Sequence, residues 1–221
     1  MEEQTQYTGM QSLNKTLAQT FLWMFLGVLA TAIIAAITYY SGVVAEVAGA
    51  WVMIGIVQIV IALVMGLLIH KLPVGVTTFL FFLYSMLTGV TFSVIFAAFE
   101  LTTIAYALIA TAGLFGVLAW AGYNTNIDLT NFGRILFIVL IIGLILTIVN
   151  IFIGSSSLDI ILDWVLLGVF AGLTIYDMNK VKSMSEMGVD SERASIYGAF
   201  QLYLDFINMF IRILSIMDRR N

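Results

Sequence analysis

Seven long apolar stretches divide this chain, and they limit its possible folds more than any other feature. A helix needs about 20 apolar residues to cross the hydrocarbon core of a membrane, and each stretch reaches roughly that length. The stretches are residues 17–40, 47–69, 74–99, 101–121, 135–153, 160–181 and 196–216. The sequence therefore predicts an all-α membrane protein, with a polar N-terminal segment at residues 1–16 and a single seven-helix transmembrane domain at residues 17–221.

Composition excludes several classes of protein. Of the 221 residues, 62% are hydrophobic and 10% are charged, a balance that does not suit a soluble surface. The chain has no cysteine and one histidine, which excludes disulfides, thiol nucleophiles and zinc clusters. Its formal net charge is -4, whereas nucleic acid is bound by clustered Lys and Arg. We therefore expect an integral membrane protein that binds no nucleic acid and is not an enzyme.

Basic residues gather on one side of the predicted helices. Short cytoplasmic loops of membrane proteins are enriched in Lys and Arg. The side that holds the N-terminus has Lys15, Lys71, Arg134, Lys180, Lys182 and Arg193, and the other side has Arg219 and Arg220. This predicts a cytoplasmic N-terminus and an external C-terminus, with a re-entrant last segment as the alternative. The short tails and the lack of sorting signals favour a bacterial inner membrane.

One face of the last stretch is polar along its whole length. At about 100° per residue, its polar side chains fall within about 80° of arc. They are Tyr197, Gln201, Asp205, Asn208, Arg212 and Ser215. Lipid cannot satisfy such groups, so this polar stripe must face protein or a water-filled cavity. We therefore expect the last helix to be surrounded by the others, and Tyr197, Gln201, Asn208 and Arg212 to line either a protein contact or a pore.

Asp177 is the expected partner of Asp205. Both acids belong to the same side of the membrane, and their depths, counted at about 1.5 Å per residue, differ by about one helical turn. Two neighbouring carboxylates in a low dielectric cannot both ionise cheaply, so they titrate as a unit and can share a proton. Losing that proton leaves two repelling charges, which is a physical basis for a pH switch. Carboxylate oxygens are also ligands that calcium prefers.

Asp177 and Asp205 are thus the candidate pH sensor, gate and metal ligands. The plainer alternative is that each carboxylate is satisfied separately and only fixes the helix register. Arg212 is expected to be an ion-pair partner or a cation that reaches the interface. Acidic residues at the ends of spans are interpreted as boundary charges, namely Glu100, Asp159 and Asp163. His70 with Lys71 predicts an interfacial anchor, and the GVFAG sequence at 168–172 predicts close helix packing.

An intramembrane aspartyl protease also uses paired aspartates, one as acid and one as base. Tyr176 and Asp177 fit the YD motif of such enzymes. The second motif is absent, because these proteases have GxGD where this chain has Leu-Tyr-Leu-Asp at 202–205, and no PAL segment follows in the last helix. Without those glycines a substrate backbone would have difficulty approaching the acid, which argues against proteolysis.

Two segments have a recognisable sequence, GAFQLYLDFINMFIRIL at 198–214 and IYDMNKVK at 175–182. They resemble the Bax inhibitor family of seven-helix membrane proteins, also called the transmembrane BAX inhibitor motif family. LYLDFIN is the specific part of the resemblance. Chain length, the number of spans and the short polar N-terminus agree over nearly the whole chain, while the first five stretches match only in hydropathy.

The resemblance implies a last helix wrapped by the other six and a pH-sensitive calcium leak, with Asp177 and Asp205 as the family's paired aspartates. Some members also have an acidic residue in the second helix and a basic cluster after it, where this chain has Gln58 and His70–Lys71. Bacterial members have been linked to regulation of a membrane-bound protease, so the alternative function is a protease regulator without ion conduction. We expect a monomer whose partners are the lipid bilayer and calcium, with no cofactor.

Overall fold

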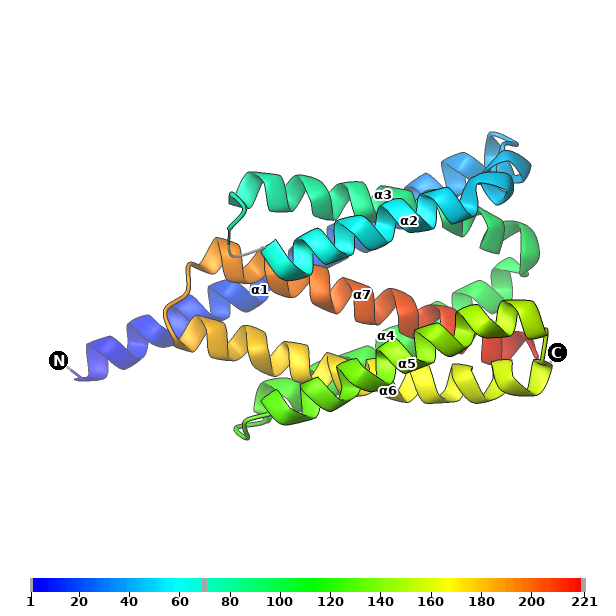
Figure 1. The fold of residues 1–221 in the computed structure, drawn as a ribbon. Helices are drawn as coiled ribbons and strands as arrows, with labels where there is room; N and C mark the ends of the chain where they lie inside the picture. The colour runs from blue at the N-terminus through cyan, green and yellow to red at the C-terminus, as the bar shows by residue number, and fades with distance from the viewer. Residues whose placement is uncertain (1, 69–70, 220–221) are drawn as a thin grey trace. The chain divides into compact units, whose positions relative to one another are not determined.

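The computed structural model describes residues 2–68 and 71–219, with side chains from residue 11 onward. Within these residues every element is an α-helix, and all seven helices are long and apolar enough to cross a membrane (Figure 1). They are α1 (Glu2–Tyr40), α2 (Val44–Leu68), α3 (Val74–Ala98), α4 (Leu101–Asn124), α5 (Thr130–Ile153), α6 (Ser156–Glu186) and α7 (Ser191–Asp218). The predicted fold class and number of spans are confirmed. His70 lies outside the described residues, so its role as an anchor stays a prediction.

The helices extend beyond their apolar stretches. α1 begins at Glu2, so residues 2–16 of the polar segment run into the first span as one continuous helix. α6 continues to Glu186 and α7 begins at Ser191. Hydropathy marks only the part of a helix that lies in hydrocarbon, whereas backbone hydrogen bonding continues through polar residues until a cap or a breaker ends it.

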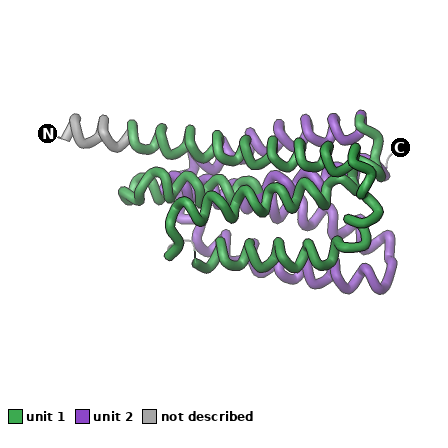
Figure 2. The backbone as a smooth tube through the Cα atoms, turned by 90° about the horizontal axis from the view of Figure 1, so that it is seen from above, with its two compact units in different colours: residues 1–101, 184–203 green, residues 102–183, 204–221 purple. Residues whose placement is uncertain are grey.

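The chain divides into two compact units, and α7 contributes a segment to each (Figure 2). Unit 1 consists of residues 1–101 and 184–203, and therefore contains α1, α2, α3 and the first part of α7. Unit 2 consists of residues 102–183 and 204–221, with α4, α5, most of α6 and the rest of α7. Asp177 and Asp205 both belong to unit 2.

In unit 1, α1 packs closely against α3. A Cβ atom on Gly89 would lie 2.6 Å from the carbonyl oxygen of Thr31, so only glycine allows the two backbones to come this near. The Thr31 hydroxyl hydrogen-bonds the phenol of Tyr203 at 2.7 Å and donates to the Ser85 carbonyl oxygen at 2.9 Å. These bonds link three helices through one buried hydroxyl group.

In unit 2, glycines of α6 and of a neighbouring helix allow close packing. A Cβ atom on Gly122 of α4 would lie 2.5 Å from the carbonyl oxygen of Ile175. Gly172, in the GVFAG sequence, contacts Leu136 and Phe132 of α5. Gly168 is exposed and has no neighbour within 4 Å of a built Cβ atom. The prediction of close packing is therefore right for Gly172 and wrong for Gly168.

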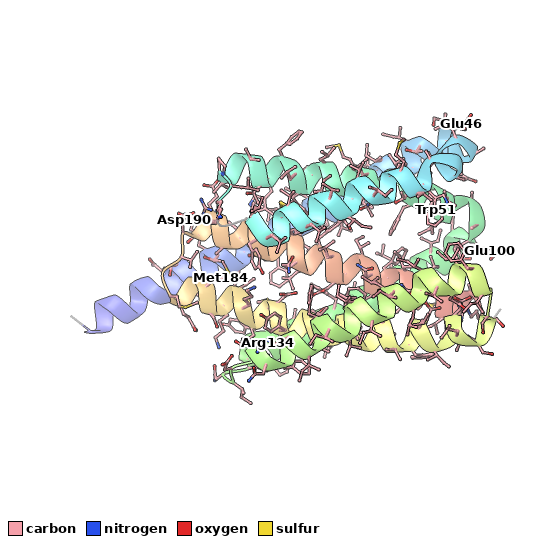
Figure 3. All side chains as sticks on the ribbon, in the orientation of Figure 1. Glu46, Trp51, Glu100, Arg134, Met184 and Asp190 are labelled. Atoms are coloured by element: carbon pink, nitrogen blue, oxygen red, sulfur yellow. The ribbon has the colours of Figure 1, made fainter. Side chains whose placement is uncertain are left out.

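The turn between α6 and α7 is built from local capping interactions. Gly188 has a positive φ of 76°, and the Val189 amide donates to the Met184 carbonyl oxygen at 3.0 Å, as in a Schellman cap. Val189 also packs against a small cluster of Met184, Ala194 and Tyr197. Asp190 then accepts hydrogen bonds from the amides of the first turn of α7. Figure 3 labels Met184 and Asp190 at this turn, which reverses the chain.

Candidate functional site

The centre of the candidate site is a carboxylate pair, formed by Asp177 of α6 and Asp205 of α7. The two side chains are 5% and 3% exposed. They lie close enough for a side-chain hydrogen bond between their carboxyl groups and for direct electrostatic interaction. The structure therefore brings together the two acids that the sequence singled out, although their depths counted along the helices differ by about one turn.

The neighbours of Asp205 include a hydroxyl group and an aromatic side chain. Thr174, one turn before Asp177, contacts the Asp205 carboxyl group and donates its own hydroxyl proton to the Phe170 carbonyl oxygen at 2.8 Å. The Phe206 ring, next to Asp205 in the chain, packs edge-on against Phe115 with 5.5 Å between ring centroids. Among the described residues, no hydrogen-bond partner reaches the buried Oδ2 atom of Asp205. One carboxylate oxygen thus remains available to a proton, a water molecule or a cation.

The polar stripe of α7 contains buried and half-buried residues. No residue from 193 to 217 is exposed, and half of the most apolar window of α7 is buried, against 11% for α2 and for α5. Tyr197 is buried, whereas Gln201, Asn208 and Arg212 are half-buried. The Asn208 amide donates to the Leu204 carbonyl oxygen of its own helix at 2.8 Å. The inward orientation of the stripe and the wrapped arrangement both stay predictions.

A second charged group, which we call the outer charge cluster, joins Asp163 of α6 to Arg212, Ser215 and Arg219. Asp163 is 4% exposed, so its interpretation as a boundary charge is wrong. Its Oδ1 atom pairs with Arg212 Nη1 at 2.9 Å, and its Oδ2 atom pairs with Arg219 Nη2 at 2.9 Å and accepts from Ser215 Oγ at 2.6 Å. Arg212 is therefore an ion-pair partner, which was one of its two predicted roles.

The sequence contained a signal for this cluster. Asp163 precedes Asp177 by two heptads, and Arg212 and Arg219 follow Asp205 by one and two heptads, so each set shares one helix face. The position of Asp163 near the start of α6 hid this relation, because acidic residues are common near helix N-termini. Asp159, one turn earlier, does behave as a terminal residue, since Asn150 donates to its carboxylate at 2.6 Å.

The described residues contain no group of three or more His, Cys, Asp or Glu side chains that could hold a metal ion. The carboxylate pair alone offers fewer oxygens than the six to eight that calcium takes. Gln58 of α2 donates to the Thr88 hydroxyl of α3 at 2.9 Å in unit 1.

Comparisons with known proteins agree with the resemblance. Residues 13–221 match the family described as "Inhibitor of apoptosis-promoting Bax1". The chain is 39% identical to the inner membrane protein YbhL of Escherichia coli K12 over 94% of this chain and 93% of that protein. It is 34% identical to an uncharacterized protein of Deinococcus radiodurans over 98% of this chain and 96% of that protein. This seven-helix membrane protein, with its paired aspartates in α6 and α7, belongs to the Bax inhibitor family.

Proposed function

We propose that this protein is a pH-sensitive calcium leak channel in which Asp177 and Asp205 form a proton-controlled gate. The observation that carries this proposal is the contact between their buried carboxyl groups. An ionised carboxylate has no proton to donate, so a hydrogen bond between two carboxyl groups requires a proton on one of them. The contact is therefore a place where one proton decides between attraction and repulsion.

The switch follows from electrostatics. With one proton shared, α6 and α7 are held together at this level. Without it, two like charges repel by about 4 kcal/mol at 4 Å and an effective dielectric constant of about 20. The same deprotonated oxygens can then bind a calcium ion, which replaces the lost proton as the positive charge between them. Proton and calcium thus compete for one site, and this competition links conduction to pH.

The type of membrane is inferred from a relative, and the orientation is inferred from the basic residues. The relative in Escherichia coli is named an inner membrane protein, and we assign this chain to a bacterial inner membrane on that likeness. Its N-terminus is cytoplasmic, because most of its basic residues belong to the loops on that side. The functional unit is a monomer, since the proposed gate lies between two helices of one chain.

The test is calcium flux from purified protein in liposomes over a pH series. Asp177→Asn and Asp205→Asn keep size and most hydrogen bonding while removing the shared proton. Each single variant is expected to lose most of the pH dependence and the apparent midpoint, and the double variant is expected to behave like either single variant, because members of one coupled unit are not additive. Asp159→Asn, at the start of the same helix and bonded to Asn150, is the matched control and should keep the wild-type profile.

Two results would contradict the proposal. If both single variants keep the wild-type pH profile, the carboxylates are structural. If the folded wild-type protein conducts no calcium at any pH, the channel is excluded, and a regulator that binds a membrane-bound protease without conduction becomes the better hypothesis. Co-purification with such a protease tests that alternative directly.

A further inference from the structure

We propose that the outer charge cluster of Asp163, Arg212, Ser215 and Arg219 is an electrostatic filter that limits the rate at which cations pass along α6 and α7. This inference rests on the proposed function and concerns a different step, the passage of the ion beyond the carboxylate pair. All four residues of the cluster belong to unit 2, as does the pair.

The cluster lies further along α6 and α7 than the carboxylate pair. Arg212 follows Asp205 by seven residues, so it lies about 10 Å further along the same face of α7, and Arg219 comes directly after the end of this helix. Asp163 precedes Asp177 by fourteen residues, which is about 20 Å along the same face of α6. The ion pairs between Asp163 and both arginines show that these two faces still meet at that level. An ion that moves from the pair toward the C-terminal end of α7 along these faces must pass the cluster.

The four residues of the cluster have a positive net charge. Two guanidinium groups share one carboxylate, so two positive charges and one negative charge leave a surplus of one positive charge. The Ser215 hydroxyl donates to the Oδ2 atom of Asp163 that pairs with Arg219, whereas Arg212 pairs with the Oδ1 atom. The buried Nε atom of Arg212 has no hydrogen-bond partner among the described residues. The surplus charge is therefore held in place at a partly buried position, where it is screened less than at an open surface.

This fixed positive charge opposes divalent cations more strongly than monovalent ones. A fixed positive charge raises the energy of a divalent cation twice as much as that of a monovalent one at the same place. The cluster thus opposes calcium most strongly, and this suits a slow leak better than a fast channel. A purely structural ion pair would instead only hold the ends of α6 and α7 together. Calcium flux would then not depend on whether a substitution makes the cluster more positive or more negative.

The experiment is a charge series at position 219, read as calcium flux in liposomes. The Arg219 side chain is 35% exposed, and its replacement leaves the Asp163–Arg212 pair in place. Arg219→Gln lowers the cluster charge from +1 to 0 and should raise calcium flux roughly three- to tenfold. Arg219→Glu lowers it to -1 and should raise the flux further. Arg219→Lys retains the charge without the planar guanidinium and should rescue the slow wild-type rate.

Asp163→Asn provides the opposite change, since it raises the cluster charge to +2 and should lower the flux. If this variant does not fold, as judged by gel filtration and thermal unfolding in detergent, the series at position 219 decides alone. The pH midpoint should remain at its wild-type value throughout, and the differences should shrink as ionic strength rises.

The outcomes separate this inference from the proposed function. Opposite effects of Arg219→Gln and Asp163→Asn, with rescue by lysine, support the filter, even if the variants of Asp177 and Asp205 retain their pH profile. Equal rates across the series, effects of one sign, or a lysine variant that behaves like glutamine overturn the filter while the pH switch stands. Absence of any wild-type flux overturns both.

Discussion

At the scale of single residues, buried hydroxyl groups form hydrogen bonds between the helices of unit 1. In unit 2, buried carboxylates make the contacts between α6 and α7. Tyr203 is fully buried two residues before Asp205, and its hydroxyl bonds Thr31 of α1. Its ring packs edge-on against Phe81 with 5.5 Å between centroids. One short segment of α7 therefore contains both Tyr203, which belongs to the hydroxyl network, and Asp205, which belongs to the carboxylate pair.

Replacing Tyr203 with Phe tests how much that network stabilises the protein. The ring contacts remain, while the Thr31 hydroxyl loses one partner. We expect a loss of about 1 kcal/mol in the free energy of unfolding, a typical value for one buried hydrogen bond. Denaturant titration in mixed micelles measures it. Tyr40→Phe is the control, since Tyr40 is 79% exposed and should give no change; an equal loss in both variants would show that the Thr31 bond contributes nothing.

At the scale of helices, close approach is decided by a few glycines among many. Gly122 faces the backbone of α6, whereas Gly116, in the same helix, has no neighbour within 4 Å of a built Cβ atom. Both glycines follow apolar residues in a sequence that gives no reason to separate them. The difference comes from the rotation of α4 about its axis, which its packing on α6 selects.

Gly122→Ala and Gly116→Ala form a matched pair for this contact. The methyl group at 122 would approach the Ile175 carbonyl oxygen, and backbone cannot move aside as a side chain can. We expect Gly122→Ala to destabilise the protein by about 1–3 kcal/mol, as overpacked contacts do. Gly116→Ala should be neutral or stabilising by up to about 1 kcal/mol, because alanine favours helix. Thermal unfolding of the two variants in detergent compares them, and similar stabilities would contradict the contact.

At the scale of the whole molecule, the distribution of basic residues makes a prediction about orientation. The loop after α4 and the loop after α3 lie at opposite ends of α4. Asn126 is exposed in the first loop and Glu100 in the second. Since Lys and Arg gather on the side of the N-terminus, the loop with Asn126 should be cytoplasmic.

The absence of cysteine makes this orientation directly measurable. Single cysteines placed at Asn126 and at Glu100 can be treated in intact cells with a thiol reagent that does not cross membranes. We expect labelling at position 100 and protection at position 126 until the cells are opened. The reverse pattern would show that the N-terminus is external, and labelling of both would show a mixed topology.

The sequence by itself determined the membrane class, the number of spans and the positions of the two acids that meet. Hydropathy adds up over neighbouring residues, and a charge inside such a stretch is costly enough to stand out, so neither requires knowledge of distant contacts. The sequence did not show that Gly172 is closely packed while Gly168 is not. It also placed Asp163 at a boundary, although that residue is buried in an ion-pair cluster. Only the tertiary structure decided these points, because which faces of two helices meet depends on their tilt and rotation. Those are set by the packing of many side chains together, and no local pattern in one helix contains them.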